Sequence, residues 1–252
     1  MAELSVILIT RDEAANIRAC LESVAWADEI IVVDSGSIDD TADIAREFTP
    51  YVYVHDWPGF GAQKNRALDY ATKEWVFSID ADERVTPELR AEMEAVMNNP
   101  QAGAYEVPRL SSFCGRFMRH SGWYPDYVLR LFRREAGKFT DVPVHERVVV
   151  PGRIARLTQP LLHYSYRDLD DVLEKLNRYS GAAAKAMQQR GGSGGLLKAV
   201  LHGIWSFIRT YFLRAGFLDG REGFMLAVLN AEHSYYRYLR LMLLDEQHNG
   251  KR

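Results

Sequence analysis

Two aspartates separated by one residue, Asp80 and Asp82, follow a short apolar segment of the chain. That segment, Glu74–Ile79, has the composition of a buried strand. Carboxylates two residues apart at the end of a strand point to the same side. Their oxygens suit Mg²⁺ or Mn²⁺, ions that proteins usually share with substrate phosphates. The pair therefore predicts a divalent metal site at the end of a strand.

Polar residues also follow two other apolar segments, at Thr10–Glu13 and Asp34–Ser37. In an open α/β sheet, ligands bind outside the carboxyl ends of the strands, so these clusters should surround one crevice. A carboxylate buried at Asp34 needs donors, which a nucleobase, a ribose or a helix N-terminus would supply. We expect Asp12, Asp39 and Asp40 to cap helices instead.

The elements that must position these residues alternate along the first part of the chain. Apolar segments predict strands at 4–10, 29–34, 51–55 and 74–79. Helical spacing predicts helices at 13–24, 39–48, 61–72 and 87–97. After Gly103 we expect strands at 105–110, 128–133, 139–150 and 161–166, then helices from Asp168 with a break at Gly191–Gly195. The predicted fold class is α/β, with a mostly parallel, Rossmann-like sheet covered by helices on both faces and a C-terminal helical region.

Composition limits the class of protein. The 252 residues are 47% hydrophobic and 26% charged, which is ordinary for a globular chain of one large domain or one domain with a helical appendage. The net charge of −3 disfavours a nucleic-acid binder. Acidic residues dominate positions 1–104 and basic residues dominate 105–167, which favours a metal in the first part and an anionic partner in the second. Solvated surface charge would give the same pattern.

Several familiar signatures are absent from the sequence. It holds no P-loop, no dinucleotide-binding glycine pattern and no G-x-S-x-G. Two cysteines, Cys20 and Cys114, favour a reducing compartment. We see no N-terminal secretory signal and expect no membrane-spanning helix, because no uncharged apolar run is long enough.

Four segments together resemble the family 2 glycosyltransferases of GT-A fold. They are SVILITRDEAANI (5–17), VVDSGSIDDT (32–41), WPGFGAQKNRAL (57–68) and WVFSIDADE (75–83). WPGFGAQKNRAL, with the later PVHERV and LLHYSYRDL, is most similar to the lipopolysaccharide inner-core β-1,4-glucosyltransferases. Ile38 departs from the usual threonine of the family, without consequence for the chemistry. The resemblance covers residues 4–167 strongly and the helical remainder loosely.

This resemblance implies roles for the matching residues. Thr10, Arg11 and Glu13 would line the nucleotide pocket, and Asp34 would accept from the uracil or ribose. Lys64 would contact the nucleotide or its phosphates. Asp80 would approach the ribose and the metal, and Asp82 would ligate the Mg²⁺ or Mn²⁺ ion, which would neutralise the diphosphate leaving group.

The resemblance also implies an inverting transfer, which needs a general base near the acceptor hydroxyl. Glu146 is the candidate base and Asp141 the runner-up. His163 is the candidate third metal ligand, with His145 as its competitor; an isolated histidine is more often structural. Salt bridges would be the ordinary role of Glu146.

Five residues are candidates for binding the acceptor. Arg130 and Arg133 alternate along one strand, and we place them on one face, where they would clamp an acceptor phosphate. An exposed strand face would have the same composition. Trp123 and Tyr124 would stack on sugar rings, as would Tyr127, although core packing explains aromatic residues nearly as well.

The apolar stripe from Leu197 to Ala215 recurs at helical spacing and is accompanied by Lys198, Arg209 and Arg214. Such a basic, aromatic helix suits a membrane interface, while packing against the rest of the chain or in a homo-oligomer is the ordinary alternative.

We divide the chain into a nucleotide-sugar part (1–104), an acceptor part (105–167) and a helical part (168–252) that contacts a membrane or a partner subunit.

The leading hypothesis is an enzyme that moves a hexose, glucose from UDP-glucose, onto a heptose of the lipopolysaccharide core. Its partners would be a UDP-sugar and a lipid-anchored anionic oligosaccharide, at the cytoplasmic face of the inner membrane. A glycosyltransferase with another lipid-linked or surface glycan as acceptor is the first alternative. A non-catalytic nucleotide-sugar-binding scaffold is the second. A phosphoacceptor signalling domain is disfavoured, because it would not need the basic middle segment.

Overall fold

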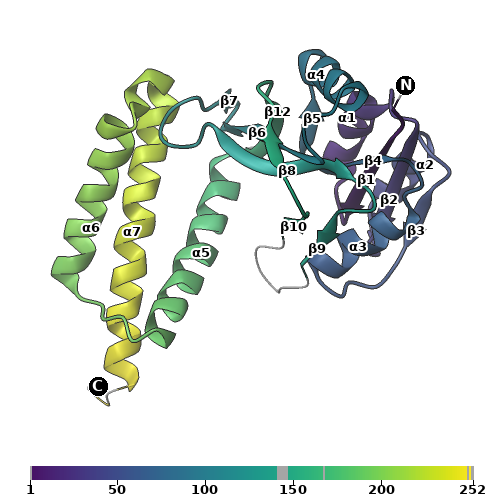
Figure 1. The fold of residues 1–252 in the computed structure, drawn as a ribbon. Coiled ribbons are helices and arrows are strands. Elements are labelled where there is room, and N and C mark those ends of the chain that lie inside the picture. Colours follow the sequence, from purple (N-terminus) through teal and green to yellow (C-terminus); the bar gives the residue numbers. More distant parts are fainter. Residues whose placement is uncertain (1, 141–146, 167, 249, 251–252) are drawn as a thin grey trace. The chain divides into compact units, whose positions relative to one another are not determined.

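A computed structural model describes residues 2–140, 147–166, 168–248 and 250 (Figure 1). These residues form two compact units. The first holds the chain up to Leu110 together with Asp126–His163, and the second holds Ser111–Pro125 and the chain from Tyr164 onward. The sequence predicts three parts divided by function, whereas these two units are defined by compact packing. The functional division therefore stays a prediction.

One mixed sheet lies at the centre of the first unit. Its parallel half has the order β3-β2-β1-β4. These strands are β1 (Leu4–Thr10), β2 (Glu29–Asp34), β3 (Val52–Val54) and β4 (Trp75–Asp80). The order continues β8-β6-β12-β5, with β5 (Glu83–Val85), β6 (Ala104–Phe113), β8 (Asp126–Arg133) and β12 (Leu161–Tyr166). Short strands complete the set: β7 (Arg116–Phe117), β9 (Lys138–Phe139), β10 (Val148–Val149) and β11 (Ile154–Arg156).

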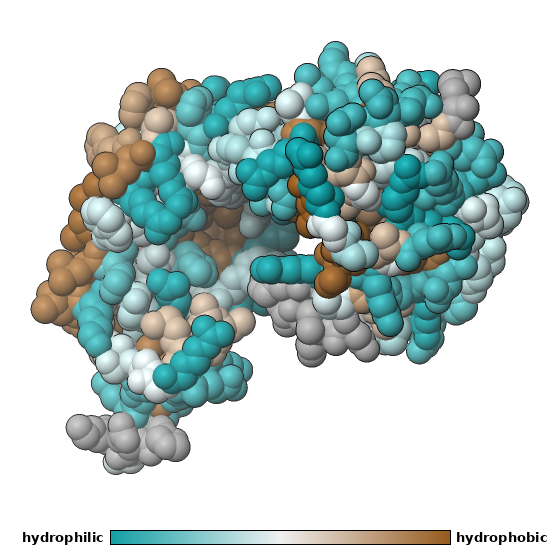
Figure 2. Space-filling view, viewed as in Figure 1, coloured by the Kyte–Doolittle hydropathy of each residue, from teal (hydrophilic) through white to brown (hydrophobic). Residues whose placement is uncertain are grey.

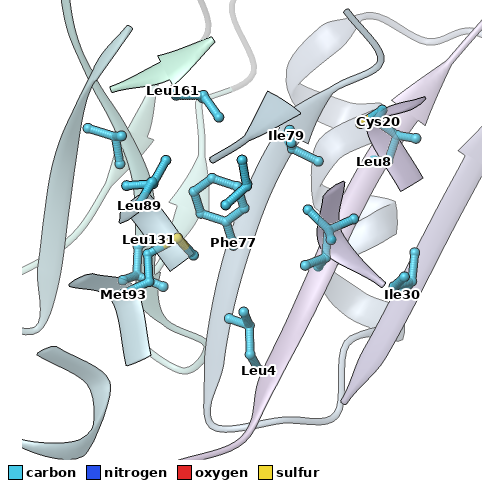
Figure 3. Close-up of a cluster of buried hydrophobic side chains, with 14 of the residues drawn as sticks. Leu4, Leu8, Cys20, Ile30, Phe77, Ile79, Leu89, Met93, Leu131 and Leu161 are labelled. Atoms are coloured by element: carbon cyan, nitrogen blue, oxygen red, sulfur yellow. The ribbon is translucent and has the colours of Figure 1, made fainter. Parts of the chain in front are cut away.

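Helices cover both faces of the parallel half (Figure 1). They are α1 (Ala14–Val24), α2 (Thr41–Arg46), α3 (Phe60–Tyr70) and α4 (Pro87–Asn98). Successive residues of β1 point to opposite faces. Val6 and Leu8 therefore pack with residues of α1, α2 and α4, whereas Ile7 packs with residues of α3. Figure 3 shows the first of these clusters, in which Phe77 of β4 lies among Leu89 and Met93 of α4.

The predicted α/β class is confirmed, and the parallel pairing holds for β1 to β4. Most of the later strands pair antiparallel, as β4 does with β8 and β6 with β8, whereas β11 pairs with β6 in parallel. The physical reason lies in the connections. Parallel neighbours need a crossover, usually a helix. No helix separates β6 from β8, so β8 returns beside β6 in the opposite direction.

The second unit is built from long helices packed side by side (Figure 1). They are α5 (Leu169–Gln189), α6 (Leu196–Ile208) and α7 (Gly220–His248). A π-helix, Arg209–Leu213, and a 3₁₀-helix, Gly216–Asp219, link the last two. The predicted glycine break lies between α5 and α6, as expected. None of the helices that the structure describes is both long enough and apolar enough to cross a membrane.

Candidate active site

The polar ends of β1, β2 and β4 lie side by side, as the sequence predicts. Thr10 is paired with Asp34 across β1 and β2, and Ile9 is paired with Asp80 across β1 and β4. The backbone amide of Ser35 donates to the carbonyl of Thr10 at 2.9 Å. The parallel pairing therefore gathers the predicted polar residues at one edge of the sheet.

Arg130 of β8 holds the turn that carries the two aspartates. Its guanidinium donates to a carboxylate oxygen of Asp80 and, at 2.6 Å, to Glu83. Glu83 in turn accepts the backbone amide of Asp80 at 3.0 Å. The ends of β4 and β5 are thus tied to one cation. Asp82 lies in the short turn between these strands, so the contacts of Asp80 and Glu83 fix the position of its backbone.

The charges in this cluster determine one another. Burial opposes ionisation of Asp80, but the positive charges of Arg130 and Lys64 hold the pKa of its carboxyl far below the usual range. Glu83 is fully buried, and burial raises its pKa. Burial also opposes the charge of Arg130, yet the two carboxylates raise its pKa. One buried guanidinium is shared by two acids, and Asp80 keeps the negative charge.

Helix α3 supplies three polar side chains with three separate contacts. Gln63 is fully buried and donates to Ser35 Oγ at 3.0 Å. Lys64 Nζ lies 3.3 Å from Asp80 Oδ1, with only 8% of its side chain exposed. Asn65 exchanges two hydrogen bonds, each of 2.9 Å, with the backbone of Phe139. The Gln-Lys-Asn sequence therefore joins the β2 loop, the β4 end and β9 through one turn of helix.

Asp34 is almost fully buried and organises its own loop. Its carboxylate accepts the backbone amides of Gly36 and Ser37, at 2.9 and 2.8 Å, and the hydroxyl of Ser37. Gly36 has a φ of +78°, which favours glycine at this turn. Three acceptor positions are therefore used inside the protein, and a carboxylate has about four. The role expected for Asp34 toward a uracil or ribose stays a prediction.

The residues around β1 are placed differently from one another. Within the described part of the chain, Thr10 Oγ1 is buried without a hydrogen-bond partner. Arg11 is largely exposed, with its Nε 3.6 Å from Asp12 Oδ2. Glu13 accepts from Asn16 at 2.8 Å. Asp39 accepts the backbone amides of Ala14 and Thr41, the first residues of α1 and α2. The prediction that Asp12 and Asp40 cap helices is wrong: Asp12 accepts the amide of Ile38, which lies outside both helices, and Asp40 precedes α2 without a side-chain cap.

The predicted metal ligands meet in part. His163 of β12 is paired with Glu83 of β5, and its Nε2 lies 3.2 Å from Asp82 Oδ2. Two ligands at right angles around one Mg²⁺ or Mn²⁺ ion, each about 2.1 Å away, would be about 3.0 Å apart. The Asp82 and His163 donors therefore fit such an ion. Asp80 is turned toward Lys64 and Arg130, and no group of three metal-ligating side chains stands preformed among the described residues.

A cavity of about 720 Å³ opens beside Asp80. This volume lies within the range of small-molecule sites. Its charged lining includes Lys64, Arg109 and Arg130 together with Asp80 and Asp126, and Arg109 is bound to Asp126 at 2.6 Å. Tyr127 and Phe139 supply aromatic surface. The cavity can receive an anionic, ring-containing ligand beside Asp80.

Other predicted residues lie elsewhere. Arg130 and Arg133 do not share a face, and that prediction is wrong, because residues three apart on a strand point to opposite sides. Arg130 is buried between the acids, whereas Arg133 stacks 4.2 Å above Trp75 and pairs with Glu74. The candidate bases Glu146 and Asp141, and His145, lie outside the described residues.

Trp123 and Tyr124 belong to the second unit. Trp123 packs against Phe113, with ring centroids 5.9 Å apart, and against Tyr166. Tyr124 lies under the guanidinium of Arg119 at 6.0 Å. Trp123 is thus part of a hydrophobic cluster, which agrees with the alternative interpretation as core. Stacking on a sugar stays a prediction.

Two residues of the site were missed from the sequence. Glu83 accepts a hydrogen bond from Arg130. Arg84 donates to the backbone carbonyls of Ala81 and Glu83 and to that of Asn16 in α1. The available signal was Glu83 itself, an acid directly after the aspartate pair and in front of a basic residue. Its burial is decided by β8, which lies about fifty residues further along the chain.

Removing the cation of this cluster should be costly. We expect Arg130→Met to lower the free energy of unfolding by about 3–5 kcal/mol, because buried Glu83 then loses the cation that donates to it and Asp80 keeps only Lys64. Urea denaturation at pH 7 measures this. Arg133→Met, on the same strand but partly exposed, is the control and should cost about 1 kcal/mol or less. Equal losses from the two variants would contradict the assignment.

The charge of Asp80 also predicts a pH dependence. Its pKa is lower in the folded than in the unfolded chain, so ionisation stabilises the fold above the unfolded value, near pH 4, and this contribution falls away as the pH drops further. The stability difference between the wild type and Asp80→Asn should therefore be full at pH 6–7 and narrow below about pH 4. Denaturation curves at successive pH values test this, and a difference that stays constant down to pH 3 would refute it.

The sequence matches a family of known proteins. Residues 5–150, more than half of the chain, match the model of glycosyl transferase family 2. An uncharacterized glycosyltransferase of Rickettsia typhi is 30% identical and aligns with 98% of this chain and 88% of its own length. A lipopolysaccharide core biosynthesis glycosyltransferase, LpsC of Rhizobium meliloti, is 30% identical over 93% of each chain.

Solved structures agree in fold. TarS of S. aureus, residues 1–349 in complex with UDP-GlcNAc, superposes with a TM-score of 0.50 over 98% of this chain and 92% of that one, at 14% identity. This likeness concerns the fold alone. Together with the family match and the relatives aligned along nearly the whole sequence, it leads to one conclusion: the chain belongs to glycosyl transferase family 2 and has its GT-A architecture.

Proposed function

We propose that this glycosyltransferase moves glucose from UDP-glucose onto a heptose of the lipopolysaccharide core, with inversion and with a divalent metal ion. The observation that carries the proposal is the β4–β5 turn. It presents Asp82 next to His163, and Asp80, directly before the turn, contacts Lys64 and lines a cavity of suitable size. The similarity to LpsC along nearly the whole chain supports the lipopolysaccharide core as the destination of the sugar.

The donor would bind across the ends of β1, β2 and β4. Thr10 Oγ1 is a buried polar atom without a hydrogen-bond partner among the described residues. Arg11, Glu13 and Asp34 lie at the same strand ends. These groups would bind the nucleoside. Lys64 would face the phosphates of the donor, because the ion pair with Asp80 holds the Lys64 ammonium at the end of β4. TarS binds UDP-GlcNAc on a similar fold, which makes a UDP-sugar the first donor class to test.

A Mg²⁺ or Mn²⁺ ion would be held by Asp82 and His163, with Asp80 nearby. When bound, the ion supplies charge neutralisation for the departing diphosphate. The protein's own contribution is rigidity: Arg130 and Glu83 hold the turn, so Asp82 needs little reorganisation to bind. Lys64 adds a positive charge on the other side of Asp80.

The acceptor would approach from the basic part of the chain. Glu146, with Asp141 as the alternative, would take the proton from its attacking hydroxyl. Arg109 lines the cavity and would face an acceptor phosphate. A lipid-anchored acceptor implies work at a membrane surface, for which we propose the cytoplasmic face of the inner membrane.

Metal removal should weaken donor binding. We expect Mn²⁺ to tighten UDP binding by at least about tenfold in the wild type, and Asp82→Ala and His163→Ala to abolish this gain, because both remove a ligand. Calorimetric titration of UDP with and without Mn²⁺ measures it. Asp43→Ala, at an exposed position of α2, is the matched control. UDP binding that is equal with and without metal would refute the metal site.

Turnover tests the base. Glu146→Gln should lower kcat for glucose transfer from UDP-glucose to a purified heptose-containing core acceptor by about 10²–10⁴-fold, with UDP binding unchanged. A panel of UDP-sugars, read by release of UDP and mass of the product, identifies the donor. Full activity of Glu146→Gln would exclude it as the base and direct the test to Asp141→Asn. Binding of UDP without turnover on any acceptor would favour the scaffold.

A further inference from the structure

We infer that the exposed face of α6, continued by the π-helix that follows it, binds the surface of an anionic lipid bilayer. The inference rests on the proposed function in one respect, the lipid-anchored acceptor that gives the contact a purpose. Its evidence comes from the second unit alone: the burial of α6, its apolar face and the charges beside that face.

One side of α6 is fixed against α7. Ala199 and Gly203 are buried, and a Cβ on Gly203 would lie 3.4 Å from the carbonyl of Ala231. Ser206 donates to the carbonyl of Asn230 at 3.0 Å. This contact determines which side of α6 faces away from α7.

That other side is apolar and exposed. Leu197, Leu201, Ile204 and Trp205 recur at helical spacing and are 70%, 56%, 54% and 52% exposed. Phe212 and Leu213 of the π-helix, with Phe217 and Leu218 after it, are also at least half exposed. Figure 2 shows hydrophobic residues gathered in a continuous band over α6. Soluble proteins rarely expose a continuous apolar surface of this kind to water, and large exposed apolar surfaces mark interaction sites.

Basic residues lie beside this band. Lys198, His202 and Arg209 are separated by four and seven residues, so they form one stripe along the edge of the apolar face. Positions 196–218 hold three Lys or Arg residues and no acidic residue. An apolar face with a basic edge and a tryptophan is the composition of a helix that lies in a membrane interface.

The charges and the length favour a bilayer surface over other occupants. A second copy of the chain on this face would present the same cations, and positions 196–218 hold no acid that could pair with them across the interface. The 13 residues of α6 span about 20 Å, less than the roughly 30 Å of a hydrocarbon core. The helix therefore lies along the surface, with its apolar side chains among the lipids and its cations at the headgroups.

Vesicle flotation with the whole protein tests the inference. The wild type should bind vesicles of phosphatidylcholine with phosphatidylglycerol, and bind phosphatidylcholine alone more weakly. Leu201→Glu with Ile204→Glu should reduce the bound fraction by at least about tenfold. Lys198→Glu with Arg209→Glu should remove the preference for anionic lipid, and added salt should have the same effect on the wild type.

Matched controls separate the face from general effects of charge. Leu173→Glu, on α5 of the same unit, and Arg153→Glu, at an exposed position of the first unit, should bind like the wild type. Thermal unfolding should be unchanged in every variant, since all these side chains are exposed.

Two results would overturn the inference. One is a wild type that does not bind anionic vesicles at low ionic strength. The other is a dimer, seen by light scattering, that Leu201→Glu with Ile204→Glu dissociates while vesicle binding is unaltered; the face would then belong to a second copy. UDP titration without vesicles is independent of both, so failure of the lipid contact and failure of the proposed donor site are distinguishable.

Discussion

The structure of the site depends on one buried cation shared by two acids. Arg130 comes from the antiparallel half of the sheet and joins Asp80 at the end of β4 to Glu83 at the start of β5. Arg130 thereby holds the residues on both sides of the turn, Asp80 and Glu83. The backbone amide of Asp80 also donates to the Glu83 carboxylate. A turn fixed at both ends presents Asp82 and limits where a metal ion can sit. The antiparallel half is therefore needed for the chemistry of the parallel half.

The same cluster explains how Lys64 can be buried at the end of β4. A buried ammonium is costly unless it is paired, and Asp80 provides the pair. Asp80 can hold this charge because two cations keep it ionised. Gln63 and Asn65, on either side of Lys64, hold the helix to the β2 loop and to β9.

The sequence predicted what local patterns determine. The alternation of apolar segments and helices located β1 to β4 and their helices, and parallel pairing then placed Thr10, Asp34 and Asp80 at one edge. It failed where distant residues decide. Arg130 looks like an exposed strand residue until β8 lies beside β4, and its separation by three from Arg133 already excludes a shared face. Glu83 looks like a surface acid until Arg130 reaches it. Burial of charge is a tertiary property, and no local spacing encodes it.

On the proposed function, Asp82 and His163 hold a metal ion beside the donor phosphates. A crystal structure with UDP-glucose and Mn²⁺, with anomalous diffraction at the manganese edge, would locate this ion. We expect an anomalous peak about 2.1 Å from Asp82 and His163 and in contact with the diphosphate, with Lys64 turned to a phosphate oxygen. A donor bound across the strand ends with no peak there, or a peak ligated by other residues, would contradict it.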